Sequence, residues 1–405
     1  MLVPNFVPRK NVVVISVCVM VVGVLVALTV IVTMPPSNAA DDGVPEVEVG
    51  LVSSYGLGMS NYQTQNSANF LAGGRTVFMR HSCHPLMVDS AEGWAVQTKD
   101  LEGLPAVFSG CGTGPASQKY GSGHMSGKRG KGDAFFHGSA ATPTVEGYRK
   151  WLHEVKTVVG NRVDRWEVWN EGDSPQFFRG TPQDLVDLTF VAAEVWGRER
   201  VIAPSFTPAA FNGSNMLSGG WDKNGKRLTR LEFATQFWQQ LVFEAKQRGV
   251  ELPVSAAVVH GYGSGATVRE AVASRNKVLA TFAALVASTG LPLWDTEWNL
   301  RSTGADPFDA GVGFPDTKNS VEGWVDSVKT AHCLGYVRQY AYLWTDQPTL
   351  TGFEVGQLQF NQTTDNINEA FRTLVNVENP VCHVPNSVGG KHFVDRNPVG
   401  EQFSS

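Results

Sequence analysis

Short apolar segments alternate with amphipathic segments along most of the chain. This alternation is typical of β-strand and α-helix units that build a parallel sheet. Eight apolar segments are predicted strands: residues 47–53, 76–80, 105–109, 165–169, 201–204, 254–260, 291–296 and 337–343. Eight is the number of strands that closes a (β/α)8 barrel, so the predicted fold is an α/β TIM barrel.

Four of the amphipathic segments carry clear helix signals. In residues 144–159, apolar positions fall on one stripe and Gly160 ends the pattern. The other three begin at Thr181-Pro182, at Thr267 and at Asn319. The last two have a glutamate three residues later, which is a capping-box pattern. Weaker patterns near residues 61–71 and 88–101 predict two further helices.

An uncharged apolar run over residues 12–33 follows Arg9 and Lys10. Its 22 residues are enough to cross a bilayer as a helix, so we expect a signal anchor with residues 1–11 in the cytoplasm. The small residues Ser37-Asn38-Ala39 leave open cleavage as a signal peptide. The protein is thus expected to be a single-pass type II membrane protein facing outward, or to be secreted.

The remaining chain divides into a linker, one large domain and a tail. The linker covers residues 34–44, the (β/α)8 domain residues 45–377 and the tail residues 378–405. Residues 110–141 form a long loop after the third predicted strand. Loops of that length are usually functional or disordered.

The composition of the chain argues against one class of partner. The formal net charge of −5 and pI near 6.0, with no basic face carrying interleaved aromatics, argue against a nucleic-acid binder. Most of the 11 tryptophans are expected in the core, although sugar-binding sites also use flat aromatic faces.

Four cysteines lie beyond the apolar run, and outside the cytosol they allow three pairings. Proximity along the chain favours Cys83–Cys111 and Cys333–Cys382, with free buried thiols as the alternative. Asn212 and Asn361 begin sequences that fit the N-glycosylation pattern.

Two glutamates end predicted barrel strands. Glu171 closes Trp169-Asn170-Glu171 after the fourth strand, and Glu297 ends the seventh. Barrel active sites lie at this face. Two carboxyl groups suffice to hydrolyse a glycosidic bond, one protonated as the acid and one ionised as the nucleophile.

These residues resemble clan A of the glycoside hydrolases, the group that includes families 5 and 39. The resemblance covers about residues 45 to 377 and rests on Trp-Asn-Glu, His260-Gly261-Tyr262 and Glu297, in that order. It implies a retaining glycosidase acting on a β-linked carbohydrate, with Glu171 as acid/base and Glu297 as nucleophile.

The resemblance also implies roles for five further residues. Asn170 would bind the sugar 2-hydroxyl, His260 the substrate, and Tyr262 the nucleophile. Trp344 would form the floor of the −1 subsite, and Arg80 would orient the nucleophile. The chain departs from family 39 because it has no additional β-sandwich.

Other functions remain open. The same barrel without turnover would be a surface carbohydrate-binding protein, and the same covalent intermediate would serve a transglycosylase. His81-Ser82-Cys83-His84 suggests a metal, but no complete ligand set with zinc spacing is present. No metal or cofactor is therefore expected.

Overall fold

The computed structural model describes the protein over residues 13–21, 24–32, 48–53, 77–81, 98–99, 101, 106–109, 142–175, 177–207, 218–302, 317–341, 373–378, 380 and 382. The chain divides into a unit up to Pro45 and a unit from Glu46 onward. The two units are described separately.

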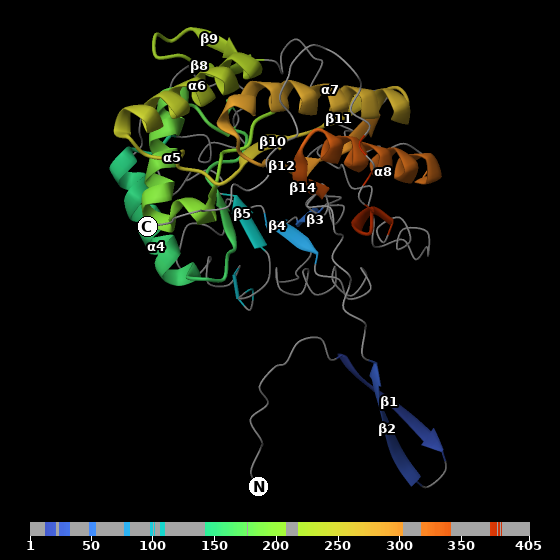
Figure 1. Cartoon of the computed structure of the whole chain (residues 1–405). Coiled ribbons are helices and arrows are strands. Elements are labelled where there is room, and N and C mark those ends of the chain that lie inside the picture. Colours follow the sequence, from blue (N-terminus) through green and yellow to red (C-terminus); the bar gives the residue numbers. More distant parts are fainter. Residues whose placement is uncertain are drawn as a thin grey trace, which may run out of the picture. The chain divides into compact units, whose positions relative to one another are not determined.

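Eight parallel strands form the sheet of the larger unit (Figure 1). They are β3 (Glu48–Ser53), β4 (Phe78–His81), β5 (Ala106–Ser109), β6 (Arg165–Glu167), β7 (Val201–Ile202), β10 (Ala257–His260), β12 (Leu293–Trp298) and β14 (Tyr336–Ala341). Their spatial order is β10-β12-β14-β3-β4-β5-β6-β7. Backbone hydrogen bonds from Ala203 N to Ala256 O (3.0 Å) and from His260 N to Phe206 O (2.8 Å) link the two edges. The result is a nearly closed barrel, as the sequence predicts.

Five helices follow strands of the barrel: α4 (Val145–Val159), α5 (Pro182–Trp196), α6 (Arg230–Arg248), α7 (Val268–Val286) and α8 (Thr317–Cys333). The four helices with clear sequence signals are all present. The capping box predicted at Asn319 is not the start of α8, because that helix already begins at Thr317. Helix α6 was not predicted, although Thr229 and Glu232 form a capping box at its start.

Three smaller features also belong to the larger unit. The antiparallel hairpin β8 (Ser218–Trp221) and β9 (Arg227–Thr229) precedes α6. Strands β11 (Gly263–Gly265) and β13 (Leu300–Ser302) pair in parallel beyond the ends of β10 and β12. Single 3-10 turns, η1 (Arg198–Arg200) and η2 (Ala287–Thr289), follow α5 and α7.

Tryptophan side chains pack helices α4 and α5 against strand β6 of the barrel. Trp166 on β6 stacks on Trp196 of α5 with ring centroids 5.3 Å apart, and Trp151 of α4 meets it edge-on at 5.7 Å. All three side chains are buried. These three tryptophans therefore serve packing, as the sequence analysis predicts for most of the tryptophans.

A buried ion pair anchors α7 to the barrel. Arg275 donates from Nη2 to Asp295 Oδ2 at 2.6 Å, and neither side chain is exposed. Arg275 also donates to the Gly261 carbonyl and to the Ser327 hydroxyl. The pair is thus fully hydrogen-bonded, which a buried charge requires.

The N-terminal unit differs from the sequence prediction. Residues 12–33 were predicted to form a membrane-spanning helix, but they hold two antiparallel strands, β1 (Val13–Val21) and β2 (Val24–Val32). The physical reason lies in the side chains, because Val, Ile and Thr favour extended backbone. Among the described residues, no helix is both long enough and apolar enough to cross a membrane.

Cys333, at the end of α8, is joined to Cys382 by a disulfide with Cα atoms 5.3 Å apart. The other predicted pair, Cys83 and Cys111, lies outside the described residues. So do the glycosylation positions Asn212 and Asn361, the loop over residues 110–141 and the helix near residues 61–71.

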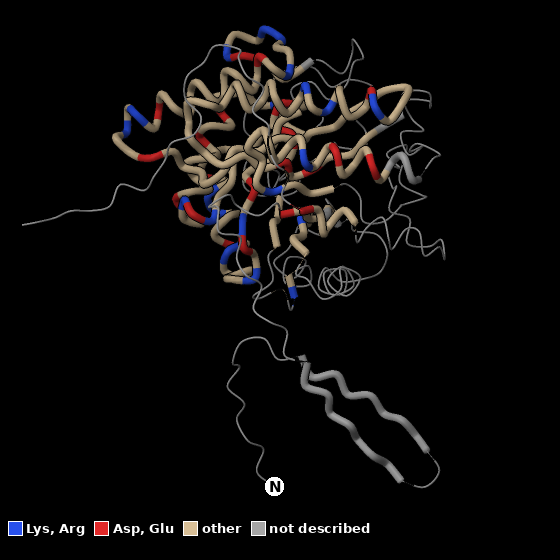
Figure 2. Tube along the Cα trace, turned by 45° about the vertical axis from the view of Figure 1, so that its right-hand side comes forward, with Lys and Arg blue, Asp and Glu red and all other residues tan. Residues whose placement is uncertain are grey.

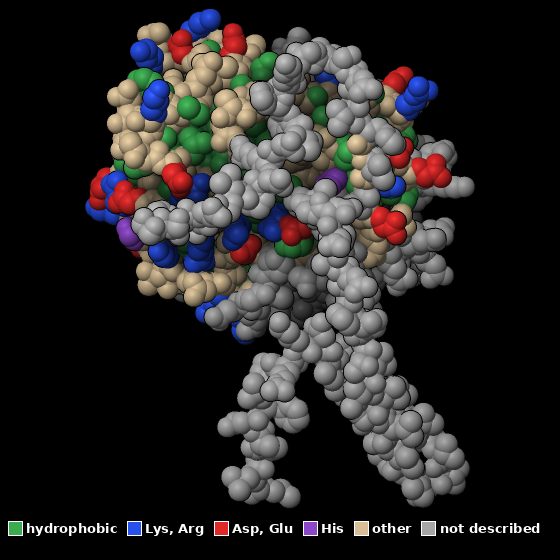
Figure 3. Space-filling model, in the orientation of Figure 1, with side chains coloured by type: hydrophobic (Ala, Val, Ile, Leu, Met, Phe, Trp, Pro, Cys, Tyr) green, Lys and Arg blue, Asp and Glu red, His purple; other side chains and the backbone are tan. Residues whose placement is uncertain are grey.

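Charges of both signs are spread over the described surface. Figure 2 shows acidic and basic residues interspersed along the helices, and Figure 3 shows apolar side chains scattered among them on one face. The exposed large apolar side chains include Phe243, at 60%, and Val250, at 52%. Such isolated residues are common on protein surfaces.

Candidate active site

Six predicted site residues converge at the carboxyl ends of the barrel strands. Arg80 lies on β4, Asn170 and Glu171 follow β6, His260 ends β10 with Tyr262 just beyond, and Glu297 lies on β12. His260 and Glu297 are register partners on neighbouring strands. The parallel barrel thereby brings together side chains that are far apart in the sequence.

Glu171 has a strained backbone. Its φ of 44° lies in the left-handed region, and it is the one non-glycine residue with positive φ in the described part of the chain. The Ser205 hydroxyl accepts from Glu171 N at 2.9 Å, and Glu171 O accepts from Ser174 N at 2.8 Å. Such strain persists where the surroundings fix the backbone, and it is concentrated at functional sites.

Gly172, beside Glu171, packs closely against α5. A Cβ at Gly172 would lie 2.5 Å from the Leu185 Cδ2 atom of α5. Gly172 N also donates to the Ser205 carbonyl at 2.9 Å. The turn after β6 is therefore held against both α5 and the next strand, and its position fixes the direction of the Glu171 side chain.

Arg80 organises the centre of the site. Its guanidinium makes a bidentate pair with Glu167 through two contacts of 2.9 Å. It also donates to Glu297 Oε2 at 2.8 Å and to Asn170 Oδ1 at 2.8 Å. Arg80 and Glu167 are completely buried, so Glu167 fixes the guanidinium that in turn holds Glu297.

Glu297 receives a second donor on its other oxygen. The Tyr262 hydroxyl donates to Glu297 Oε1, while Arg80 takes Oε2. Glu297 is thus held at both oxygens in one orientation, as a nucleophile aimed at carbon requires.

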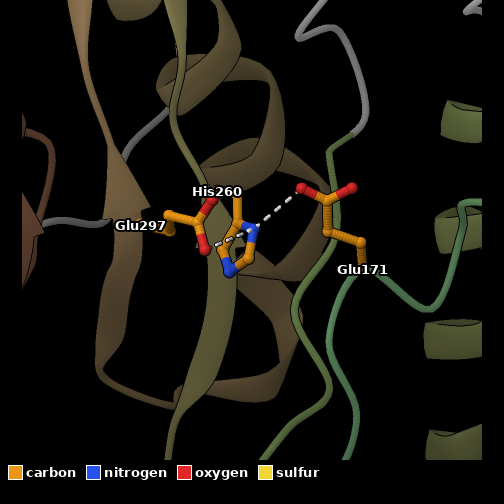
Figure 4. A group of neighbouring side chains, drawn as sticks. All are labelled: Glu171, His260 and Glu297. Carbon is orange, nitrogen blue, oxygen red and sulfur yellow. Dashed lines mark hydrogen bonds and ion pairs between the residues drawn. The ribbon is translucent and has the colours of Figure 1, made fainter. Parts of the chain in front are cut away.

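His260 lies between the two candidate catalytic glutamates. Its Nδ1 is 3.2 Å from Glu171 Oε1 and 3.9 Å from Glu297 Oε2. Figure 4 shows Glu171 and Glu297 approaching the imidazole from opposite sides. Single oxygens of the two glutamates and a ring nitrogen of His260 all lie within 4.8 Å of one another.

Neighbouring charges shift the pKa values of Glu171 and His260 in opposite directions. Burial raises the pKa of Glu171, but the hydrogen bond and charge of His260, together with Arg230 and Arg80, bring it below its usual value. Burial lowers the pKa of His260, but the carboxylates of Glu297 and Glu171 raise it above its usual value. The contact between the two groups thus favours the carboxylate form of Glu171 and the protonated form of His260.

The same three side chains are also a potential cation site, because their ligand atoms are close together. Two contacts weigh against that use. Arg80 already places a positive charge 2.8 Å from Glu297 Oε2, and Tyr262 occupies the other oxygen. A metal ion bound here would lie beside the Arg80 guanidinium and be repelled by its charge, so the arrangement favours proton and carbon chemistry.

Sequence reasoning identified some of the residues and missed others. It did not identify Glu167, Ser205 or Arg230. Glu167 had a signal, since it is a charged residue inside an apolar strand pattern. The contact of His260 with Glu171, where the resemblance implied a substrate contact, needed the structure. Trp344 lies outside the described residues.

Comparisons with known proteins give structural likeness alone. The sequence matches no protein-family model and no curated protein sequence. Among solved structures, the chain is similar to a family 26 endo-β-1,4-mannanase from Cellulomonas fimi (TM-score 0.48, 12% identity, covering 83% of this chain and 72% of that one).

Two further structures are similar over most of their length. One is a family 5 glycoside hydrolase from Prevotella bryantii B14 (TM-score 0.44, 14% identity, 82% of this chain and 97% of that one). The other is a family 128 endo-β-1,3-glucanase from Amycolatopsis mediterranei (TM-score 0.43, 14% identity, 81% of this chain and 99% of that one).

Proposed function

We propose that the protein is a retaining glycoside hydrolase that cleaves a β-linked oligo- or polysaccharide, with Glu171 as acid/base and Glu297 as nucleophile. One observation carries the proposal: oxygens of Glu171 and Glu297 lie within 4.8 Å of each other on opposite sides of His260. Retaining enzymes separate their carboxyl groups by about 5–5.5 Å, whereas inverting enzymes need about 6.5–9.5 Å for a water molecule. The observed spacing belongs with the shorter class.

In the first step, a Glu297 oxygen attacks the anomeric carbon and the bond to the leaving oxygen breaks. Glu171 gives that oxygen a proton, so the aglycone departs as an alcohol and a glycosyl ester remains on Glu297. A proton on His260 can pass to Glu171 across their 3.2 Å contact. Arg80 and Tyr262 hold the two oxygens of Glu297 in place for the attack.

In the second step, Glu171 takes a proton from water and the resulting hydroxide attacks the anomeric carbon, which releases Glu297. Ester formation has by then removed the negative charge of Glu297. That charge is the main group raising the pKa of His260 in the free site. With that charge removed, and with its proton already given to the leaving group in the first step, the His260–Glu171 pair stays deprotonated and the Glu171 carboxylate can accept a proton from water.

The stereochemistry of the product tests the mechanism. Proton NMR of a β-glycoside digest should show the β-anomer of the sugar first, before mutarotation. Glu297→Ala should abolish turnover, and added azide should then yield the α-glycosyl azide. Glu171→Ala should retain the first step for substrates with good leaving groups, because these need little protonation.

The exposed Glu251→Ala variant serves as the control and should keep wild-type turnover, since its side chain is 79% exposed and pairs with Arg198. An α-anomer as first product would exclude the retaining mechanism. Full activity of Glu297→Ala would exclude the assignment of the nucleophile.

We also propose that the barrel works outside the cytosol. The Cys333–Cys382 disulfide supports this, since such bonds persist in oxidising compartments. Protease treatment of intact cells that produce the full chain tests the location. Protection of the barrel domain until the cells are lysed would contradict it.

A further inference from the structure

Arg230 is a buried arginine next to Glu171, and the proposed mechanism does not yet give it a role. It occupies the first position of α6, directly after the β8–β9 hairpin, and its side chain is 7% exposed. Its Nη1 lies 3.8 Å from Glu171 Oε2, the oxygen opposite the one that contacts His260. The two oxygens of Glu171 thus face different cationic groups.

The guanidinium also holds the turn that carries Glu171. It donates from Nη2 to the Ser174 hydroxyl at 3.3 Å and from Nη1 to the Thr207 hydroxyl. Thr207 N donates to Asp173 Oδ2 at 2.9 Å. Arg230 is therefore connected to the two residues that close the turn, where Glu171 adopts its left-handed backbone.

Charge gives Arg230 a second effect. The groups that face Glu171 are His260 on β10, Arg230 on α6, Arg80 on β4, Glu297 on β12 and Asp173 on its own turn. Arg80 is already engaged by Glu167 and Glu297. Arg230 is the cation close to Oε2, and it favours the carboxylate form of Glu171.

We propose that Arg230 is a positioning residue for the acid/base: it fixes the Glu171 turn and stabilises the Glu171 carboxylate once its proton has passed to the leaving group. This inference rests on the proposed function. It assigns the first residue of α6 a part in proton donation, which makes Glu171 a stronger acid for substrates whose leaving groups require protonation.

The test compares Arg230→Gln and Arg230→Lys with the wild-type full chain on a series of aryl and alkyl glycosides. Arg230→Gln should lower kcat/KM by roughly 10- to 100-fold for poor leaving groups, within the range of general-acid catalysis, and little for dinitrophenyl glycosides. Its alkaline limb should move to higher pH, because the carboxylate loses a nearby cation. Arg230→Lys should restore both properties in large part.

Arg227→Gln is the matched control, since it removes an exposed arginine three residues earlier, on β9, and should change neither property. A uniform loss over all leaving groups, with an unmoved alkaline limb, would show a merely structural residue and overturn the inference. Near-ultraviolet circular dichroism identifies a variant that fails to fold, in which case Arg230→Lys decides through its pH profile.

A second measurement does not require turnover. Carbon-13 NMR of carboxyl-labelled glutamate, with the Glu171 signal assigned through Glu171→Gln, follows the titration of Glu171 directly. Arg230→Gln should raise its apparent pKa, and an unchanged titration would overturn the inference. A wild-type chain that hydrolyses no glycoside would instead refute the proposed function, and the NMR comparison would still decide the role of the charge.

Discussion

Both oxygens of the Glu297 carboxylate are held by protein donors before any substrate arrives. Arg80 takes one oxygen and Tyr262 the other. The two donors differ in what else supports them, because Arg80 is also fixed by the buried Glu167. The tyrosine contact is therefore the one that can be removed without leaving a buried charge unpaired.

Tyr262→Phe should lower kcat/KM by roughly 10- to 100-fold, the effect of losing one hydrogen bond to a charged group. The fold should be kept, since the ring remains. Tyr336→Phe is a suitable control, because that hydroxyl donates to the Leu279 carbonyl at 2.9 Å, outside the site. Equal activity of Tyr262→Phe and the wild type on an aryl glycoside would contradict the role of Tyr262.

The shifted pKa of the buried Asp173 leads to a prediction about stability. Burial raises the pKa of Asp173 to about 6, from an ordinary value of 3.8, and the charge of Arg230 only partly opposes this. A raised pKa means that the folded state holds the proton more tightly, so this contribution to stability is complete below pH about 4 and is lost as the pH rises through 6.

The free energy of unfolding of Asp173→Asn, relative to the wild type, should therefore increase between pH 4 and pH 7, by up to about 3 kcal/mol. Urea unfolding at a series of pH values measures it. Glu251→Gln, at an exposed position, should show no such trend. A constant difference between Asp173→Asn and wild type would contradict the shifted titration.

Among the elements, α7 depends on a buried charge. Arg275 and Asp295 pair at 2.6 Å with neither side chain exposed. Arg275→Met should cost about 3–5 kcal/mol in the free energy of unfolding, because it leaves a buried carboxylate uncompensated. Chemical denaturation measures the loss, and adding Asp295→Asn should recover part of it.

An exposed pair supplies the contrast for that experiment. Arg149 and Glu194 pair at 3.1 Å with side chains 29% and 57% exposed. Arg149→Met should cost no more than about 1 kcal/mol. Equal losses in Arg149→Met and Arg275→Met would show that burial does not control the strength of the α7 anchor.

The strands and helices also show which sequence signals were sufficient to predict an element. The eight strands were predictable because each lies in or beside a short, mainly apolar segment that alternates with amphipathic ones. The apolar run at residues 12–33 misled, because length alone suggested a helix while its Val, Ile and Thr content favoured the strands that formed. Helix α6 was overlooked although Thr229 and Glu232 carry its capping box.

At the scale of the whole molecule, the order of the barrel strands determines where the candidate site lies. Glu171 and Glu297 were predictable because each follows or ends an apolar run, and parallel strands bring those ends together. Arg230 was not predictable, because 56 residues separate it from its contact Ser174 and no motif marks it. A contact of that kind depends on how the hairpin and α6 pack, which a single sequence does not show.

The disulfide is a whole-molecule constraint, since Cys333 and Cys382 are 49 residues apart in sequence. A loop of that length contributes about 4 kcal/mol through the entropy of the unfolded chain. The double variant Cys333→Ser with Cys382→Ser should unfold at a lower temperature by calorimetry, while its kcat/KM at 25 °C stays near the wild-type value. An unchanged melting temperature would indicate that the bond does not constrain the unfolded chain.

The left-handed backbone at Glu171 has a consequence for selection. Asparagine and glycine adopt that conformation at lower cost than glutamate does, by about 1 kcal/mol. Glu171→Asn should therefore relieve strain while removing the acid/base. A library of this chain selected for heat resistance alone would be expected to lose this carboxylate early, so the stability of the barrel and its chemistry compete at one backbone position.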